Sequence, residues 1–198
     1  MQRFIALAFS TLLLLSLNAA TPETHYTVIV SLDGFRWDYP DMYKTPNLDR
    51  MAADGVKAVM LPSYPASTFP NHYTLATGLV PDHHGIINNT FWDVKNRRQY
   101  SMGDSATRNN PEYYLGKPIW ITAQKQGVKT GNMYWVGSDI AIKKSHPTYY
   151  RPWNAKPFLT FEQRIDTVLT WLQKPEPERP RLCLLYTSDA ADEARSVD

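Results

Sequence analysis

An apolar run that ends in an acid–glycine pair constrains the fold of this chain more than any other feature. Tyr26–Leu32 is rich in β-branched and apolar residues, which predicts a buried strand of the parallel type. Asp33-Gly34 follows it directly. Because open α/β sheets bind their ligands beyond the carboxyl ends of their strands, Asp33 is a candidate site residue.

Predicted strands and helices alternate along the rest of the chain. Thr45 is expected to cap a helix that Gly55 ends in the left-handed conformation, and Thr160 begins a capping box with Gln163. Further helices are predicted over 67–77 and 118–126, strands over 56–61, 129–135 and from 181, and mostly loop over 81–114 and 137–160. This βαβα order predicts the α/β class with a mostly parallel sheet.

The N-terminus has the pattern of a secretory signal peptide. Arg3 supplies a positive charge, Phe4–Leu17 is mainly apolar, and Asn18-Ala19-Ala20 offers small residues for cleavage. The apolar run is short for a membrane span of roughly 20 residues, and an uncleaved anchor is the alternative. We therefore predict a periplasmic or secreted protein that keeps no membrane anchor once residues 1–20 are removed.

The C-terminal residues 183–198 are predicted to be a non-native tail. Cys183–Glu193 reads as the translation of a DNA sequencing adapter, and Ser196–Asp198 fits the continuation of the same strand. A natural polar tail is the alternative. Cys183 is also the chain's one cysteine, which excludes a disulfide framework. The net charge of only +2 gives no basis for nucleic-acid binding.

Two side chains could carry chemistry. Asp33 follows a strand, and Thr68 lies at or just before a helix N-terminus, where amide donors favour anions. A threonine hydroxyl is a poor nucleophile unless a base or metal activates it, and a carboxylate such as Asp33 could hold that metal. The spacing alone leaves the simpler alternative open, that Asp33 turns the chain and Thr68 caps the helix.

A series of short motifs, in order, covers the chain from about Tyr26 to Leu182. These are Ser31–Arg36, Thr45–Leu48, Thr68–Tyr73 with Thr77-Gly78-Leu79, His84–Asn89, Pro118-Ile119-Trp120, Gly137-Ser138-Asp139 and Phe161–Val168. Together they resemble the nucleotide pyrophosphatase/phosphodiesterase family of the alkaline-phosphatase superfamily. The resemblance implies an α/β/α sandwich, incomplete here, with residues 21–182 as the N-terminal part of a phosphodiesterase catalytic domain.

The resemblance also implies a reaction and its residues. Asp33 would bind one of two catalytic Zn²⁺ ions, and Thr68 would bind the same zinc and attack phosphorus. Asn89 would donate a hydrogen bond to a phosphoryl oxygen, while Phe69 and Trp153 would stack on a nucleobase. Trp153 stands where the family has tyrosine. The substrate would be a small nucleotide or phosphodiester, cleaved by double displacement through a phosphothreonine.

The family's later metal-binding motifs do not occur in this sequence. Two of the ligands of one zinc are present and those of the other are missing, so the chain as written is predicted to be inactive. His72 and His84 are interpreted as structural and Trp135 as a packing residue. The alternatives are a phosphomonoesterase or phospholipid-headgroup phosphodiesterase of the same superfamily, and a non-catalytic binding protein with this fold.

Overall fold

Four parallel strands form the main sheet of this computed structural model, which describes residues 25–153 and 155–187. Their spatial order is β1-β6-β4-β5. The strands are β1 (Thr27–Leu32), β4 (Thr130–Met133), β5 (Tyr149–Arg151) and β6 (Leu182–Thr187). In register, Val28 lies opposite Cys183, and Gly131 lies opposite the same cysteine from the other side. The C-terminal strand of the described part therefore lies inside the sheet.

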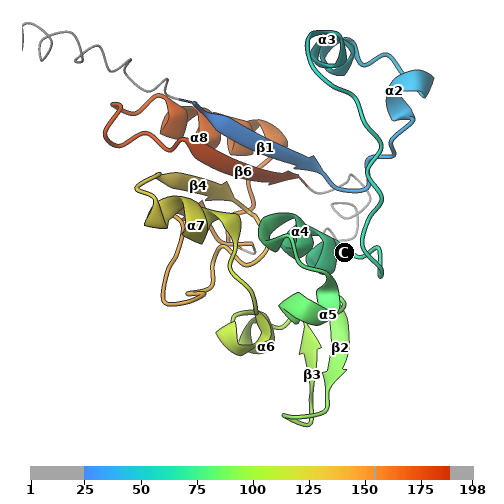
Figure 1. The fold of residues 1–198 in the computed structure, drawn as a ribbon, viewed down its shortest axis with the longest axis vertical. Helices are drawn as coiled ribbons and strands as arrows, with labels where there is room; N and C mark the ends of the chain where they lie inside the picture. Colours follow the sequence, from blue (N-terminus) through green and yellow to red (C-terminus); the bar gives the residue numbers. More distant parts are fainter. Residues whose placement is uncertain (1–24, 154, 188–198) are drawn as a thin grey trace, which may run out of the picture.

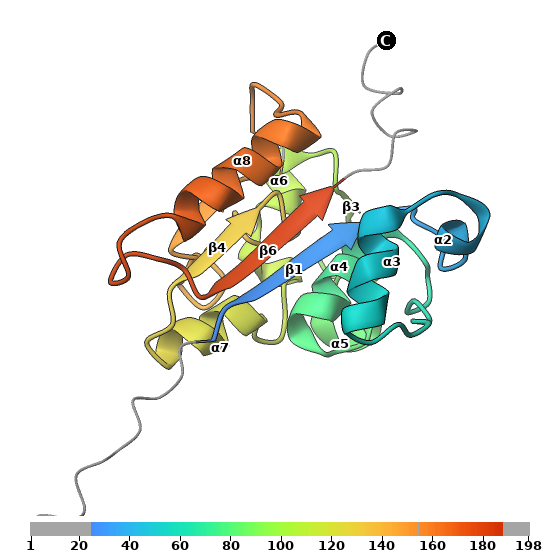
Figure 2. The same ribbon diagram turned by 90° about the horizontal axis from the view of Figure 1, so that it is seen from above.

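Helices cover both faces of this sheet (Figures 1 and 2). The helix α8 (Phe161–Leu172) packs on one face, where Gly131 has no side chain and the ring of Trp171 approaches its backbone. On the other face lie α4 (Thr68–Thr77) and α7 (Ile119–Lys125). The ring of His72 on α4 contacts the ring of Tyr186 on β6, at 4.8 Å between centroids. The described part is thus three-layered.

Smaller elements extend from these layers. The short helices α2 and α3 project beyond the end of β1, and a hairpin lies beyond α5 (Figure 1). Their bounds are α2 Tyr39–Met42, α3 Pro46–Asp54, α5 Pro81–His84, β2 Thr90–Asp93, β3 Arg98–Ser101, α6 Ser105–Arg108 and η1 Pro111–Tyr113.

The predicted alternation of strands and helices is confirmed. The helix α4 ends at Gly78, whose φ of 69° is the left-handed exit that glycine accommodates best. The capping box is also present, because the Thr160 hydroxyl accepts from the Gln163 amide while the Gln163 side chain accepts from the Thr160 amide. Terminal signals of this kind are local, so sequence alone can identify them.

Other local predictions are wrong. The segment 56–61 forms no strand, and 81–114, predicted as mostly loop, contains two strands and three short helices. The segment 137–160 is mostly loop as predicted, with the three-residue strand β5 inside it. Gly55 has a φ of −137°, so α3 does not end in the left-handed conformation. The Thr45 hydroxyl donates to the carboxylate of Asp49 instead of accepting from the helix backbone. These features depend on pairing partners and on competing side chains, which local sequence does not specify.

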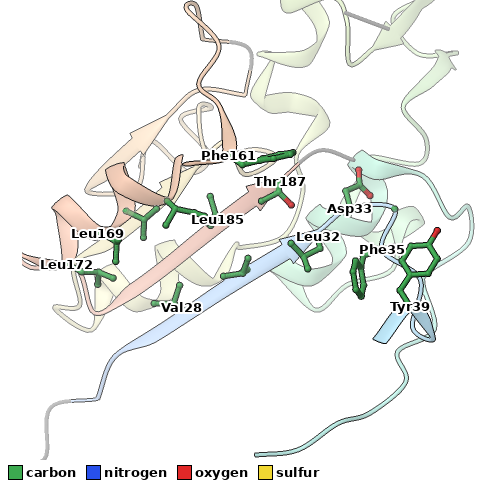
Figure 3. Close-up of a pocket in the computed structure, with 14 residues that line it drawn as sticks. Val28, Leu32, Asp33, Phe35, Tyr39, Phe161, Leu169, Leu172, Leu185 and Thr187 are labelled. Carbon is green, nitrogen blue, oxygen red and sulfur yellow. The ribbon is translucent and has the colours of Figure 1, made fainter. Parts of the chain in front are cut away.

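The first strand is parallel as predicted, but it is not buried. Within the described residues β1 pairs only with β6 and forms an edge of the sheet. Val28, Val30 and Leu32 are each more than 40% exposed. An apolar sequence predicts a buried strand because helices usually cover both faces of a parallel sheet. In the described residues, the face of β1 that carries Val28, Val30 and Leu32 is left partly uncovered (Figure 3).

The core is dominated by aromatic rings. Trp120, Trp135, Tyr73, Tyr100 and Phe69 are all essentially fully buried. The strand β6 crosses this core with Cys183 and Leu184 at most 1% exposed. Its residues 183–187 fall in the predicted adapter-derived stretch, and they fit a central strand because they are mostly apolar or aromatic. Residues 188–198 and the predicted signal peptide lie outside the described residues, so the domain boundaries stay predictions.

Candidate functional site

Asp33 and Thr68, distant in sequence, meet at the carboxyl end of β1. The Thr68 hydroxyl donates a hydrogen bond to Asp33 Oδ2 over 3.1 Å. The phenol of Tyr186, near the end of β6, donates to the same oxygen over 2.8 Å. Adjacent parallel strands end at one edge of a sheet, so the two strand ends and the start of α4 converge on a single carboxylate. Asp33 and Thr68 are both half-buried, so a ligand from solvent can reach them.

A neighbouring asparagine fixes the loop that leads into α4. The side-chain amide of Asn71 donates to the carbonyl oxygens of Ser63, Pro65 and Ser67, and its Oδ1 accepts from the Ser63 amide over 2.7 Å. These bonds hold the loop against the first turn of the helix that carries Thr68. Sequence reasoning gave Asn71 no role, and its place in the motif Thr68–Tyr73 was the available signal.

Asn89 lies beside the same helix start. Its Oδ1 accepts a hydrogen bond from the backbone amide of Phe69 over 2.9 Å. Because the amide oxygen is engaged there, the Nδ2 group is directed away from that contact, and it has no hydrogen-bond partner among the described residues. The neighbouring Asn88 accepts from the Ser67 hydroxyl and from the Asn89 amide. Asn89 can therefore present a donor beside Thr68.

Both histidines of the motifs are structural. The Nδ1 of His72 lies 2.8 Å from the carbonyl oxygen of Thr68, which can only accept, so Nδ1 carries the proton. Its Nε2 then accepts from the Ser31 hydroxyl over 2.7 Å. Both ring nitrogens are occupied, and burial lowers the pKa of His72. The ring links β1 to the start of α4.

His84 has the opposite tautomer and the same kind of role. Its Nδ1 accepts from the Ile86 amide over 3.2 Å, so the proton lies on Nε2, which faces the carbonyl oxygen of Pro70. Burial lowers its pKa as well. Trp135 is fully buried and donates from Nε1 to the His72 carbonyl oxygen, in agreement with its predicted packing role.

Phe69 and Trp153, which are predicted to stack on a nucleobase, lie in direct contact with each other. Their ring centroids are 4.9 Å apart and the planes are nearly perpendicular, at 83°. Trp153 also contacts Tyr186, at 4.5 Å. A base held between two rings needs them about 7 Å apart, twice the ordinary carbon contact distance. In this arrangement the rings close the slot, and Trp153, which is the more exposed of the two, would have to move to open it.

The metal-binding capacity of these side chains is partial. Asp33 and Thr68 place two oxygen atoms 3.1 Å apart, a spacing that two ligands of one zinc ion can have. No group of three or more histidine, cysteine, aspartate or glutamate side chains gathers within residues 25–153 and 155–187. The described residues thus fit half of a tetrahedral site. In the same ranges, no helix has the length and apolarity to cross a membrane.

The fold and this site define an α/β domain with a hydroxyl–carboxylate pair at the strand ends. A model of the family described as type I phosphodiesterase/nucleotide pyrophosphatase matches residues 27–194, and the chain belongs to that family. It is 41% identical over 165 residues to ectonucleotide pyrophosphatase/phosphodiesterase family member 3 of Bos taurus, and 42% identical over 170 residues to member 1 of Homo sapiens. Venom phosphodiesterase 1 of Crotalus adamanteus is 39% identical over 165 residues.

Each of these alignments covers at least 82% of this chain but at most 19% of the relative. Murine ectonucleotide pyrophosphatase/phosphodiesterase 5 has a similar solved structure, with a TM-score of 0.76 and 33% identity over 86% of this chain. The chain spans 45% of that structure, and an inactive threonine-to-alanine variant of the same murine protein is known in complex with AMP. The alkaline-phosphatase-like α/β fold is thereby confirmed.

Proposed function

We propose that the whole protein hydrolyses phosphodiester or pyrophosphate bonds with Thr68 as its nucleophile. The observation that carries this proposal is the 3.1 Å contact between the Thr68 hydroxyl and Asp33 at the N-terminus of α4. The family supports the reaction class, since its members include nucleotide pyrophosphatases and phosphodiesterases by name. The inactive threonine variant of a relative supports a threonine as the reacting group.

In this reaction Thr68 Oγ1 forms a bond to phosphorus as the bond to the leaving alcohol or phosphate breaks. The hydroxyl proton leaves to solvent. Water then attacks the phosphothreonine, the bond between phosphorus and Oγ1 breaks, and the hydroxyl regains a proton. The backbone amide of Thr68 and the Nδ2 group of Asn89 would donate to the phosphoryl oxygens, where negative charge increases, whereas the Phe69 amide is engaged by Asn89 Oδ1 and Pro70 has no N–H.

Asp33 and Thr68 would hold one of two zinc ions of the whole protein. Bound zinc lowers the pKa of a ligating hydroxyl and neutralises charge on phosphate oxygens. The described residues provide two of the ligands that one such ion needs. We infer that the 198-residue chain is inactive by itself and that the remaining ligands come from other parts of the whole protein.

The proposed substrate is a small nucleotide or related phosphodiester. Phe69 is fully buried under Trp153, so the two rings would provide the two stacking faces only after Trp153 moves away from Phe69. Export to the periplasm or medium is proposed from the pattern of residues 1–20. The names of the mammalian relatives, which are ectonucleotide enzymes, are in line with a place outside the cytoplasm.

The test compares Thr68→Ala and Thr68→Ser in the whole protein with p-nitrophenyl thymidine monophosphate as substrate. We expect Thr68→Ala to lose at least about 1000-fold in kcat/KM, because no other group can form the covalent intermediate. Thr68→Ser should keep measurable activity, because it retains a hydroxyl that can form the covalent intermediate. Unchanged activity of Thr68→Ala would overturn the proposal. Hydrolysis of the substrate by the purified 198-residue chain, if lost on Thr68→Ala, would overturn the inference that the chain alone is inactive.

A further inference from the structure

Two side chains at the end of β1 and two of α4 form a closed hydrogen-bonded connection. Ser31 and Asp33 are two positions apart, so their side chains point to the same side of the strand. Thr68 and His72 are four positions apart and lie one above the other on the helix. The Ser31 hydroxyl donates to Nε2 of His72 over 2.7 Å, and Nδ1 of His72 donates to the Thr68 carbonyl oxygen over 2.8 Å. Since the Thr68 hydroxyl donates to Asp33 over 3.1 Å, the strand end holds Thr68 by both its backbone and its side chain.

The ring of His72 contacts the backbone of Thr68 and not its reacting hydroxyl. A general base must reach the proton that it removes, and both ring nitrogens of His72 are engaged elsewhere. The side chain is also fixed in place. His72 is 4% exposed, and its ring lies 5.4 Å from the ring of Trp135 and 4.8 Å from that of Tyr186, between centroids. His72 can therefore influence the reaction only through the position of Thr68.

The first turn of α4 takes its position from contacts outside the helix. Its N-cap residue, Ser67, makes no side-chain hydrogen bond to the helix backbone and donates to Asn88 instead. A helix start without such a cap is not fixed by its own sequence. Asn71 bonds to the loop before the helix, and Asn89 bonds to the Phe69 amide from the segment after it. The bond between His72 and Ser31 joins the helix to the strand that leads into Asp33.

We propose that Ser31 and His72 are positioning residues that set the distance and direction of Thr68 Oγ1 relative to Asp33. An attacking oxygen has to lie within about 3.5 Å of the atom it attacks, and a displacement of about 1 Å can cost about 100-fold in rate. Neither residue is placed against substrate, so their loss should lower kcat and leave KM nearly unchanged. This inference rests on the proposed nucleophilic role of Thr68.

Substitutions in the whole protein, assayed with p-nitrophenyl thymidine monophosphate, test the proposal. His72→Gln removes the Nδ1 donor to the Thr68 carbonyl oxygen, and it should lower kcat about 100-fold with KM within about 3-fold. Ser31→Ala removes only the hydroxyl that holds the ring to β1, and it should lower kcat about 10-fold. This milder variant keeps the test available if His72→Gln does not fold. Ser31→Thr retains a hydroxyl and should recover most of the loss.

His84→Gln is the matched control. His84 is also buried and also packs against α4, but its ring nitrogens bond to the Pro70 carbonyl oxygen and the Ile86 amide. Thermal unfolding gives the folded fraction of each variant, and kcat is expressed per folded molecule. His84→Gln should then keep kcat within about 3-fold of the unsubstituted protein, whatever its unfolding temperature. Equal kcat values for the two histidine variants would assign His72 to the fold alone and overturn the proposal.

Thr68→Ala separates a failure of this inference from a failure of the proposed function. If Thr68→Ala keeps full activity, the proposed function is wrong. If Thr68→Ala is inactive while His72→Gln and Ser31→Ala keep full kcat, Thr68 is the nucleophile and only the positioning role is wrong.

The proton on His72 gives a readout that does not depend on turnover. NMR spectroscopy of the whole protein with isotope-labelled histidine should find the neutral Nδ1–H tautomer, in the signal that His72→Gln removes. Ser31→Ala should shift the Nε2 resonance of that ring, because Nε2 loses its donor. A proton on Nε2 would reverse the bond to Ser31 and leave none for the Thr68 carbonyl oxygen, which would overturn the proposal.

Discussion

The backbone amide of Phe69 donates a hydrogen bond to Oδ1 of Asn89 over 2.9 Å. This contact joins the first turn of α4 to the segment that precedes β2. It also orients the side-chain amide of Asn89, since the oxygen faces the helix and the nitrogen must face elsewhere. The contact makes Asn89 a hydrogen-bond acceptor for the fold, and the proposed function would add a second, separable role as a donor in the site.

Asn89→Asp separates these two functions. The carboxylate keeps the acceptor for the Phe69 amide but removes the Nδ2 donor. In the whole protein we expect kcat/KM to fall by about 100-fold, the usual effect of losing one donor to a developing oxyanion, with the unfolding temperature nearly unchanged. Asn88→Asp is the matched control, because it adds the same negative charge at the adjacent residue. Its side-chain oxygen still accepts from the Ser67 hydroxyl and from the backbone amide of residue 89. Equal losses in both variants would assign the effect to charge and contradict a donor role.

His84 should make stability depend on pH near neutrality. Burial lowers its folded-state pKa below the ordinary value of 6.5. The unfolded chain therefore binds this proton at higher pH than the folded chain does, so the stabilisation is complete above about pH 6.5 and is lost as pH falls toward the folded-state pKa. We expect the urea midpoint of the 198-residue chain to decrease from pH 7 to pH 5. His84→Gln should flatten that decrease, whereas His83→Gln, at an exposed neighbour, should not. A decrease that His84→Gln leaves intact would exclude this origin.

The sequence predicted those parts of the fold that depend on local signals. The capping box at Thr160 and the exit of α4 at Gly78 are examples, because their residues contact each other within one turn. The hairpin of β2 and β3 was missed, since its strands are short and polar at several positions and are stabilised by distant rings such as Tyr113. The exposure of β1 was missed because an apolar sequence indicates that a strand needs a covering layer on each face. It does not show that both layers are present.

For the site, Asp33 and Thr68 could be found because strand ends and helix starts converge in α/β folds. The hydrogen bond from Tyr186 to Asp33 could not be predicted, since that phenol comes from a strand in the segment predicted to be non-native. The perpendicular contact of Phe69 and Trp153 could not be predicted either. The resemblance indicates which rings belong to the site, but not how they are oriented toward each other. Sequence thus located the site, and tertiary contacts set its geometry.

The capping box gives a prediction of stability. Thr160→Ala removes the hydroxyl that accepts from the Gln163 amide at the start of α8. Loss of such a cap costs about 1 kcal/mol, which corresponds to a decrease of about 3 °C in the unfolding temperature of a chain of this size. Thr170→Ala is the control, because its hydroxyl donates to the Asp166 carbonyl oxygen within the same helix and alanine favours helix. Calorimetry should find Thr170→Ala neutral or slightly stabilising, and an equal decrease for both variants would argue against the cap.

Cys183 reports whether β6 occupies the centre of the sheet in solution. Its backbone lies between β1 and β4, its side chain is fully buried, and this burial raises the pKa of the thiol to about 11. At pH 8 only about 0.1% of such a thiol is ionised, and the thiolate is the reactive form. We expect Ellman's reagent to react with Cys183 of the 198-residue chain at least about 100-fold more slowly than with the exposed thiol of Val94→Cys. The difference should vanish in 8 M urea, a concentration of about the order that unfolds small domains. Equal rates in buffer would mean that β6 does not pack inside the sheet. The hydrogen bond from Tyr186 on the same strand to Asp33 would then be absent as well.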